Sequence, residues 1–241
     1  MVNLDIRLKA VYDMVGKSES VLDVGSDHGY LPIQLFKNNM IKRAVISDVN
    51  EGPLLNAKEN FSKMFKEEKD VTFVLSDGMK NIDTNNIETL CICGMGGELI
   101  IDILNDDLEK TKGFKNIILQ PMNSVDMVRK YLYDNSFTIV DEDLIRDRHH
   151  FYNVLKVISK KDDEKYEDVF FDLGYKLYEK GNENFLDFLN YKIKVNKKIV
   201  ENCKNKNTEN AKEALNKAKD YITLLERVRE NYESKRYNKV H

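Results

Sequence analysis

The sequence predicts an α/β protein with a mostly parallel seven-stranded sheet, an antiparallel last strand and a C-terminal α-helical hairpin. Between Val21 and Ile158, short apolar runs alternate with longer amphipathic stretches, which is the rhythm of βαβ units with helices on both faces of a sheet. The last two runs are separated only by "RDRHH", which indicates an antiparallel hairpin. After Ile158 the apolar residues follow a heptad pattern instead.

The strands are predicted from seven apolar runs, most of which are followed by a turn signal and a helix-length segment. Pro53 to Phe65 and Ser124 to Tyr133 are two such segments. Before the first run, apolar residues spaced three and four apart between Leu4 and Val15 predict a helix that packs on the sheet. In chain order the runs are VLDV, AVISD, VTFVL, LCIC, NIILQ, FTIVDEDLI and FYNVLKVI.

The C-terminal part begins with a charged connector, "SKKDDEKYED", and continues with two apolar seams at helical spacing. The first seam runs from Leu186 to Cys203 and the second from Leu215 to Tyr232, with "KNKNTEN" as the turn between them. The pattern predicts an antiparallel coiled coil. We therefore expect two domains, residues 1–160 and residues 161–241.

Composition indicates a soluble, cytoplasmic protein that does not enter a membrane. Of 241 residues, 41% are apolar, which is enough for a core, and no apolar run approaches the ~20 residues that span a bilayer. The N-terminus lacks the apolar region of a signal peptide. Cys91 and Cys93 would share one face of a strand; buried strand residues are favoured over a metal pair, so no metal is expected.

Charge is distributed unevenly along the chain. The net charge is −3, yet residues 189–241 carry 14 Lys and Arg against 7 Asp and Glu, a balance of +7 that leaves −10 for the rest. A polyanionic partner is one interpretation, and a solvated Lys-rich helical surface is the other. Charge alone favours the second interpretation.

The stretch "DVGSDHGYLP" follows the first predicted strand, where open α/β sheets bind their ligands. Gly25 permits a tight turn, but Asp27 and His28 stand where a dinucleotide-binding loop would have a further glycine. A carboxylate there would repel a pyrophosphate. The loop therefore disfavours a dehydrogenase and favours a cationic cofactor without phosphates.

Acidic residues also follow the second and third predicted strands. Asp48 can accept hydrogen bonds from ribose hydroxyls, and Asp77, before Gly78, can accept from an adenine amino group. A turn or helix-cap aspartate is the alternative at each position. Taken with Asp23 and Gly25, the three strand ends match the demands of an adenosine that lies across them.

The fourth and fifth predicted strands end in "CGMGGEL" and "LQPMNS". Three glycines around Met95 leave the backbone free to approach a flat ligand, and the helix that follows points its amide groups at the site. Gln120 and Asn123 offer amide groups that can bind a base edge.

These motifs, with "DVNEGPLLNAKEN" and the "LDIRL" segment near the N-terminus, resemble those of the bacterial tRNA (adenine-22 N1)-methyltransferases. The resemblance covers nearly the whole chain. It implies a Rossmann-like class I methyltransferase fold with a C-terminal coiled coil, S-adenosylmethionine as cofactor, and tRNA as partner. The methylated atom would be N1 of an adenine in the D-loop region. The missing glycine then has a use, because the methyl donor is a sulfonium cation without phosphates.

The resemblance also implies site residues in three groups. The catalytic group is Asp27, Met95 and Gly96. The cofactor-binding group is Arg7, Asp23, Gly25, Ser26, Asp27, His28, Asp48, Val49, Asp77, Gly78, Gly94 and Met95. The substrate-binding group is Tyr30, Gly97, Gln120, Pro121 and Asn123. For Tyr30, as for Phe151 and Tyr152, a place in the core is favoured over a stacking surface for the base. In one departure, Met122 stands where the resemblance implies an asparagine.

The chemistry implied by the resemblance needs no general base, because adenine N1 attacks through its lone pair. We expect Asp27 to stabilise the positive charge that moves to the purine. Two other classes remain open. One is a methyltransferase for another RNA, a protein or a small molecule, with the hairpin as a dimer interface. The other is a non-catalytic RNA- or protein-binding adaptor.

Overall fold

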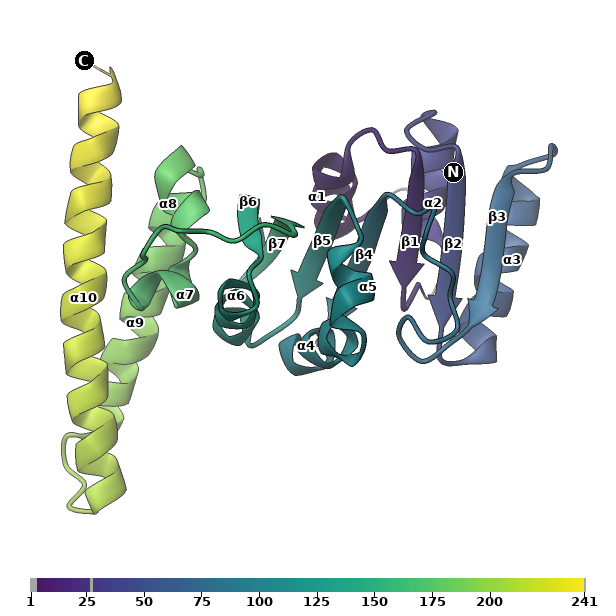
Figure 1. Ribbon diagram of the computed structural model, residues 1–241. Coiled ribbons are helices and arrows are strands. Elements are labelled where there is room, and N and C mark those ends of the chain that lie inside the picture. The colour runs from purple at the N-terminus through teal and green to yellow at the C-terminus, as the bar shows by residue number, and fades with distance from the viewer. Residues whose placement is uncertain (1–3, 27, 241) are drawn as a thin grey trace. The chain divides into compact units, whose positions relative to one another are not determined.

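The computed structural model describes residues 4–26 and 28–240, the last three of them by backbone alone. The chain forms two compact units, Met1–Lys165 and Tyr166–His241. The first holds every strand in the described ranges, and the second is helical (Figure 1).

The first unit is built on one seven-stranded sheet in the order β3-β2-β1-β4-β5-β7-β6. The first five strands pair in parallel, whereas β7 is antiparallel to both β5 and β6. The predicted fold class is therefore confirmed, and each apolar run coincides with one strand, apart from Phe137, which directly precedes β6. The strands are β1 (Ser20–Val24), β2 (Arg43–Asp48), β3 (Asp70–Leu75), β4 (Thr89–Met95), β5 (Asn116–Pro121), β6 (Thr138–Asp147) and β7 (His150–Ile158).

Helices cover both faces of this sheet (Figure 1). One face packs against α1 (Ile6–Val15), α2 (Tyr30–Lys37) and α3 (Glu51–Met64). The other packs against α4 (Gly97–Asp106), α5 (Leu108–Lys112) and α6 (Val125–Asp134). Because side chains alternate along a strand, β1 sends Val21 to the first core and Leu22 to the second.

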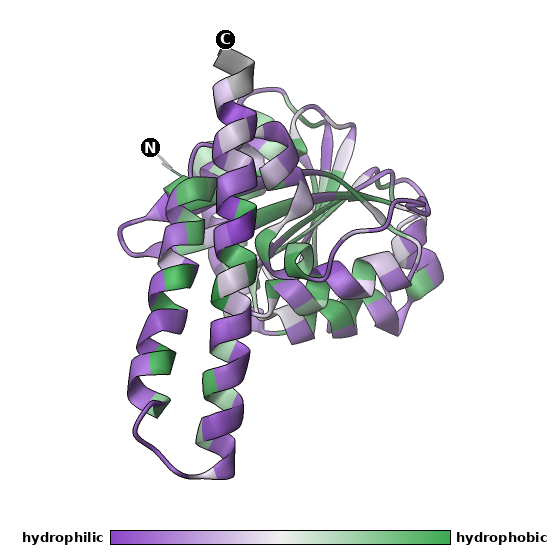
Figure 2. Ribbon diagram, turned by 90° about the vertical axis from the view of Figure 1, so that its left-hand side faces the viewer, coloured by the Kyte–Doolittle hydropathy of each residue, from purple (hydrophilic) through white to green (hydrophobic). Residues whose placement is uncertain are grey.

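The second unit contains α7 (Val169–Leu173), α8 (Tyr175–Lys180), α9 (Phe185–Cys203) and α10 (Glu209–Val240). The two long helices lie side by side and run in opposite directions, with a largely hydrophilic outer surface (Figure 2). The predicted helical hairpin is present, and α10, with 32 residues, extends beyond its predicted apolar seam at both ends. Knobs-into-holes packing, which defines a coiled coil, stays a prediction.

A short hydrogen-bonded cluster ties three helices of the second unit together. Asp172 of α7 accepts a hydrogen bond from the Lys192 ammonium of α9 at 2.6 Å and another from the Tyr221 hydroxyl of α10. Within the described ranges, no helix of either unit is long and apolar enough to cross a bilayer.

A buried ion pair lies between α6 and the β6–β7 hairpin. Arg129 and Glu142 are 3% and 1% exposed, and Nε of the arginine donates to Oε1 of the glutamate at 2.6 Å. An amino group of the same guanidinium donates to Asn153 Oδ1 at 2.9 Å. Such a pair contributes little net stability, but losing one partner leaves the other charge buried without compensation.

Arg129→Met is therefore expected to lower the free energy of unfolding by about 3–5 kcal/mol in urea titration, because the buried Glu142 carboxylate loses the positive charge of Arg129. The matched control is Lys63→Met, which breaks the exposed Lys63–Glu59 pair and should cost less than about 1 kcal/mol. Equal losses in the two variants would show that the pair between Arg129 and Glu142 is not buried in solution.

Candidate functional site

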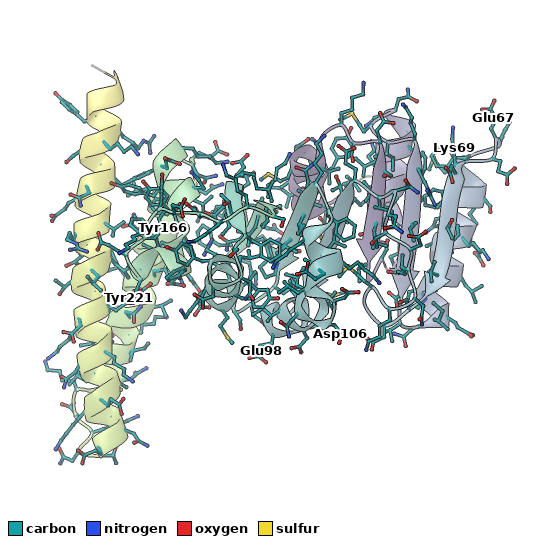
Figure 3. The ribbon with its side chains drawn as sticks, in the orientation of Figure 1. Glu67, Lys69, Glu98, Asp106, Tyr166 and Tyr221 are labelled. Atoms are coloured by element: carbon teal, nitrogen blue, oxygen red, sulfur yellow. The ribbon has the colours of Figure 1, made fainter. Side chains whose placement is uncertain are left out.

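The parallel strands β1 to β5 all end at one edge of the sheet, and this edge with the loops that leave it carries the predicted site residues other than Arg7, which belongs to α1 (Figure 1). Glu98, in the first turn of α4, projects from the same edge (Figure 3). Ligands of open α/β sheets bind at such an edge.

The loop after β1 depends on the glycine at position 25. Gly25 has φ +74°, and its N–H and that of Ser26 both donate to the carbonyl of Ser47 on β2. A Cβ at position 25 would lie 2.0 Å from the Cε of Met95, so the Met95 side chain packs onto the bare glycine backbone. Asp27, which follows in the same loop, lies outside the described residues, and its catalytic and cofactor-binding roles stay predictions.

A cavity of about 370 Å³ opens beside this loop. The ends of β1 and β4 form part of its wall, and the start of α2 and the N-terminal segment before and within α1 form the rest. The rings of His28 and Tyr30 stack at one side, with centroids 5.0 Å apart and planes 23° from parallel. The lining residues are Asp5, Arg7, Leu8, Asp23, Gly25, Ser26, His28, Gly29, Tyr30, Leu31, Cys93 and Gly94.

Asp23 places a carboxyl group in this cavity at the end of the central strand. Its side chain is buried, and burial raises its pKa from 3.8 to about 6, against a smaller lowering by a hydrogen bond with Ser26. Among the residues that the structure describes, no lysine or arginine forms an ion pair with it. A cationic ligand group in the cavity would offset the cost of this buried charge.

Arg7 supplies the cationic side chain of the same cavity. One guanidinium nitrogen lies 3.1 Å from the Met122 sulfur, and the guanidinium carbon lies 5.9 Å from the centre of the Tyr152 ring. The same nitrogen would be 3.6 Å from a Cβ at Gly94. The helix before the first strand therefore brings a positive charge over the β4 loop.

Cys93 also lines the cavity, next to Gly94. Burial first, and then the nearby Asp23 carboxylate, raises the pKa of its thiol above the ordinary value. The thiol therefore stays protonated and is no nucleophile. Within the described ranges, no group of three or more His, Cys, Asp or Glu side chains is arranged to hold a metal ion.

The loops after β4 and β5 touch each other through their backbones. A Cβ at Gly97 would lie 2.7 Å from the Ser124 carbonyl oxygen and 2.8 Å from that of Asn123, so only glycine fits. The Gly94 N–H donates to Gln120 Oε1 at 3.1 Å, and the Gly97 N–H donates to Asn123 Oδ1 at 3.0 Å. Two amide side chains thus hold both ends of the three-glycine loop.

The carboxylates that follow β2 and β3 make contacts within the protein. Asp48 is 8% exposed, and its Oδ1 accepts from the Asn50 N–H at 2.9 Å. The exposed Asp77 accepts from the Lys80 ammonium at 2.7 Å, and Lys80 also lies 3.2 Å from Asp106 at the far end of α4 (Figure 3). Each carboxylate therefore makes a local contact of the kind expected of an aspartate in a turn or at a helix cap.

The cavity gathers some of the predicted residues and leaves others along the edge. Seven of them line it: Arg7, Asp23, Gly25, Ser26, His28, Tyr30 and Gly94. The other predicted residues that the structure describes do not: Asp48, Val49, Asp77, Gly78, Met95, Gly96, Gly97, Gln120, Pro121 and Asn123. The predicted set lacks five lining residues, and the signal that could have found them was that each is next to a predicted residue or within two positions of one. They are Asp5, Leu8, Gly29, Leu31 and Cys93.

Comparison with known proteins gives concordant matches. The family model for "tRNA (adenine(22)-N(1))-methyltransferase" matches residues 21–226. A Bacillus subtilis tRNA (adenine(22)-N(1))-methyltransferase is 27% identical over 232 residues, which cover 94% of this chain and 97% of the relative.

Solved structures agree with the sequence matches. A Streptococcus pneumoniae protein in complex with S-adenosyl-L-methionine superposes with a TM-score of 0.81 at 29% identity, covering 94% of this chain and 100% of the other. M. capricolum TrmK in complex with S-adenosyl-homocysteine superposes with a TM-score of 0.77 at 29% identity, covering 92% and 99%.

Removing the charge of Asp23 is expected to stabilise the ligand-free protein at neutral pH. The folded-state pKa is raised from 3.8 to about 6, so the stability from the protonated carboxyl is fully present below pH 3.8 and is lost as the pH rises through about 6. Asp23→Asn should therefore raise the free energy of unfolding by about 1–3 kcal/mol at about pH 7.5, with a smaller gain as the pH falls below 6.

Urea unfolding across this pH range measures the effect. Asp102→Asn, an exposed position on α4, is the control and should change stability by less than about 0.5 kcal/mol. A gain at Asp23 that does not depend on pH, or a loss at neutral pH, would contradict the electrostatic explanation.

Proposed function

The chain belongs to the tRNA (adenine(22)-N(1))-methyltransferase family, and we propose that it performs the family's reaction at the sheet edge described above. The reaction transfers a methyl group from S-adenosylmethionine to N1 of adenine 22 in tRNA. The observation that carries the proposal is the buried Asp23 carboxylate in a cavity that also holds the Arg7 guanidinium.

The residues of the cavity fit the amino-acid end of S-adenosylmethionine, which bears one ammonium and one carboxylate. When bound, this cofactor supplies a methyl group activated by its attachment to a sulfonium. We propose that Asp23 receives the ammonium and Arg7 the carboxylate, because these are the buried acid and the nearby base of the cavity. Ser26, His28 and the open backbone at Gly25 and Gly94 would complete this end of the site.

For the adenosine end we propose the residues that follow β2 and β3. Asp48 keeps one carboxylate oxygen beyond its bond to Asn50 and could accept from the ribose hydroxyls. Val49 is 61% exposed and offers an apolar surface to a base. Asp77 and Gly78 would contact the adenine amino edge, with Lys80 holding the Asp77 side chain in place.

The acceptor base is proposed to lie against Met95, Gly96 and Gly97, with the β5 end (Gln120, Pro121 and Asn123) beside it and Tyr30 as a stacking surface. Adenine N1 has a free lone pair at neutral pH, so these residues need only exclude water and hold the base in line at about 3–3.5 Å. The base must leave its stack to reach them. Asp27 is proposed to stabilise the positive charge that develops on the purine.

The basic second unit is proposed to bind the tRNA backbone, since phosphate contacts dominate such affinity. Its surface carries exposed lysines without an ion-pair partner among the described residues, among them Lys194 and Lys198 on α9. Because tRNA is the proposed substrate, we expect the enzyme to act in the cytoplasm.

Incubation with unmodified tRNA and methyl-labelled S-adenosylmethionine tests the activity. We expect one N1-methyladenosine per tRNA, at position 22, detected by nucleoside analysis and by a reverse-transcription stop, because the new methyl group blocks base pairing. A tRNA with guanine at position 22 should stay unlabelled. Label at a different nucleotide, or none in tRNA, would disprove the proposed function.

The tRNA-binding role of the second unit is tested with the double variant Lys194→Ala/Lys198→Ala. It should weaken tRNA binding about tenfold at low salt and flatten the dependence of affinity on salt, with donor binding unchanged. Lys37→Ala/Lys66→Ala removes two exposed lysines from the first unit and serves as the control. If the two double variants bind tRNA equally, the second unit is not the docking surface.

A further inference from the structure

The amide side chains of Gln120 and Asn123, at the β5 end, differ in how many of their hydrogen-bonding groups are used within the protein. Gln120 is 1% exposed; its Oε1 accepts from Gly94, and its Nε2 donates to the Pro121 carbonyl at 3.0 Å. Both ends of its amide are therefore used within the protein. Asn123 is exposed and uses only its oxygen, which accepts from the Gly97 N–H.

The contact with Gly97 fixes which way the Asn123 amide points. A backbone N–H can only donate, so the amide oxygen must face Gly97 and the amide nitrogen must face away from it. Among the residues that the structure describes, none accepts a hydrogen bond from Asn123 Nδ2. The Nδ2 group is thus a donor held in one orientation at the edge where the acceptor base must bind.

The backbone around Asn123 is also unusual. Ser124, the next residue, has φ +49°, a left-handed conformation that L-residues with side chains seldom adopt. Such strain persists where the surrounding structure imposes it, and it clusters at binding sites. Here the carbonyl oxygens of Asn123 and Ser124 lie within 2.8 Å of where a Cβ at Gly97 would be, so this segment packs closely on the glycine loop.

We propose that Asn123 Nδ2 donates a hydrogen bond to a ring nitrogen of the target adenine, either N7 or N3, and thereby turns N1 toward the methyl donor. This inference rests on the proposed function and adds the atom through which the base is oriented. N7 and N3 are the ring acceptors that remain once N1 is reserved for the reaction, whereas the exocyclic N6 amino group is a donor and cannot pair with Nδ2.

The rival role for Asn123 is purely structural, as an anchor for the N-terminus of α4. Asn123→Asp separates the two roles, because the new carboxylate still accepts from Gly97 and is favourable at a helix N-terminus, yet it has no N–H to donate. If the side chain only anchors the loop, aspartate therefore rescues it. If it orients the base, aspartate does not.

In the first experiment, Asn123→Asp is expected to lower kcat/KM for tRNA by about tenfold to a hundredfold, because a buried base acceptor loses its donor. Affinity for S-adenosylmethionine and thermal stability should stay within about twofold and about 2 °C of the wild type. Asn105→Asp, at the other end of α4, adds the same charge at an exposed position and should leave kcat/KM unchanged.

The second experiment identifies the acceptor with tRNAs that carry 7-deazaadenine or 3-deazaadenine at position 22. The measured quantity is the ratio of wild-type to Asn123→Asp activity on each tRNA, since this ratio cancels changes in the intrinsic reactivity of N1. We expect the ratio to fall to about one on the analogue that lacks the bonded nitrogen and to stay at its normal value on the other.

The outcomes separate this inference from the function on which it rests. If the wild-type protein makes no N1-methyladenosine in ordinary tRNA, the proposed function fails. If the wild type is active and Asn123→Asp matches it, or the ratio is the same on all three tRNAs, only the role of Nδ2 is overturned. If Asn123→Asp no longer binds S-adenosylmethionine, the wild-type protein alone decides. Its activity on each analogue is then compared with the uncatalysed methylation of that analogue, and normal activity on both would also overturn the role of Nδ2.

Discussion

The parallel pairing of β1 with β2 on one side and β4 on the other is the interaction on which the site depends. Parallel strands end at a common edge, so residues that are distant in sequence meet there without long loops. The N–H groups of Gly25 and Ser26 extend this pairing by donating to the Ser47 carbonyl beyond the last ladder position. Gly25 and Ser26, the first residues after β1, are therefore held by the same neighbouring strand as β1 itself.

Asp23 shows how this framework holds an unfavourable group in place. A carboxylate at the end of a central strand loses its water, and this desolvation raises its pKa to about 6. Apolar cores lie on both faces of the strand that carries it. A ligand ammonium would then gain more from this carboxylate than from a hydrated one, because desolvation has already occurred in the free protein.

Much of the fold was predictable from the sequence, because strand periodicity and the "RDRHH" hairpin are local patterns. The strand-end residues Asp23, Asp48 and Asp77 could also be found, since an α/β sheet places its ligands there. Their partners could not: the Lys80–Asp77 contact and the Gly97–Asn123 bond depend on how loops of different βα units meet. Coiled-coil packing and the roles of Asp27 stay predictions, because each rests on contacts that sequence spacing does not define.

The close approach of Gly97 to the carbonyls of Asn123 and Ser124 has an evolutionary consequence. Neither loop can change its backbone path alone, since a side chain at position 97 would displace the other loop and free Ser124 from its left-handed conformation. We therefore expect a substitution that changes the backbone of one loop to be accepted only together with a compensating substitution in the other.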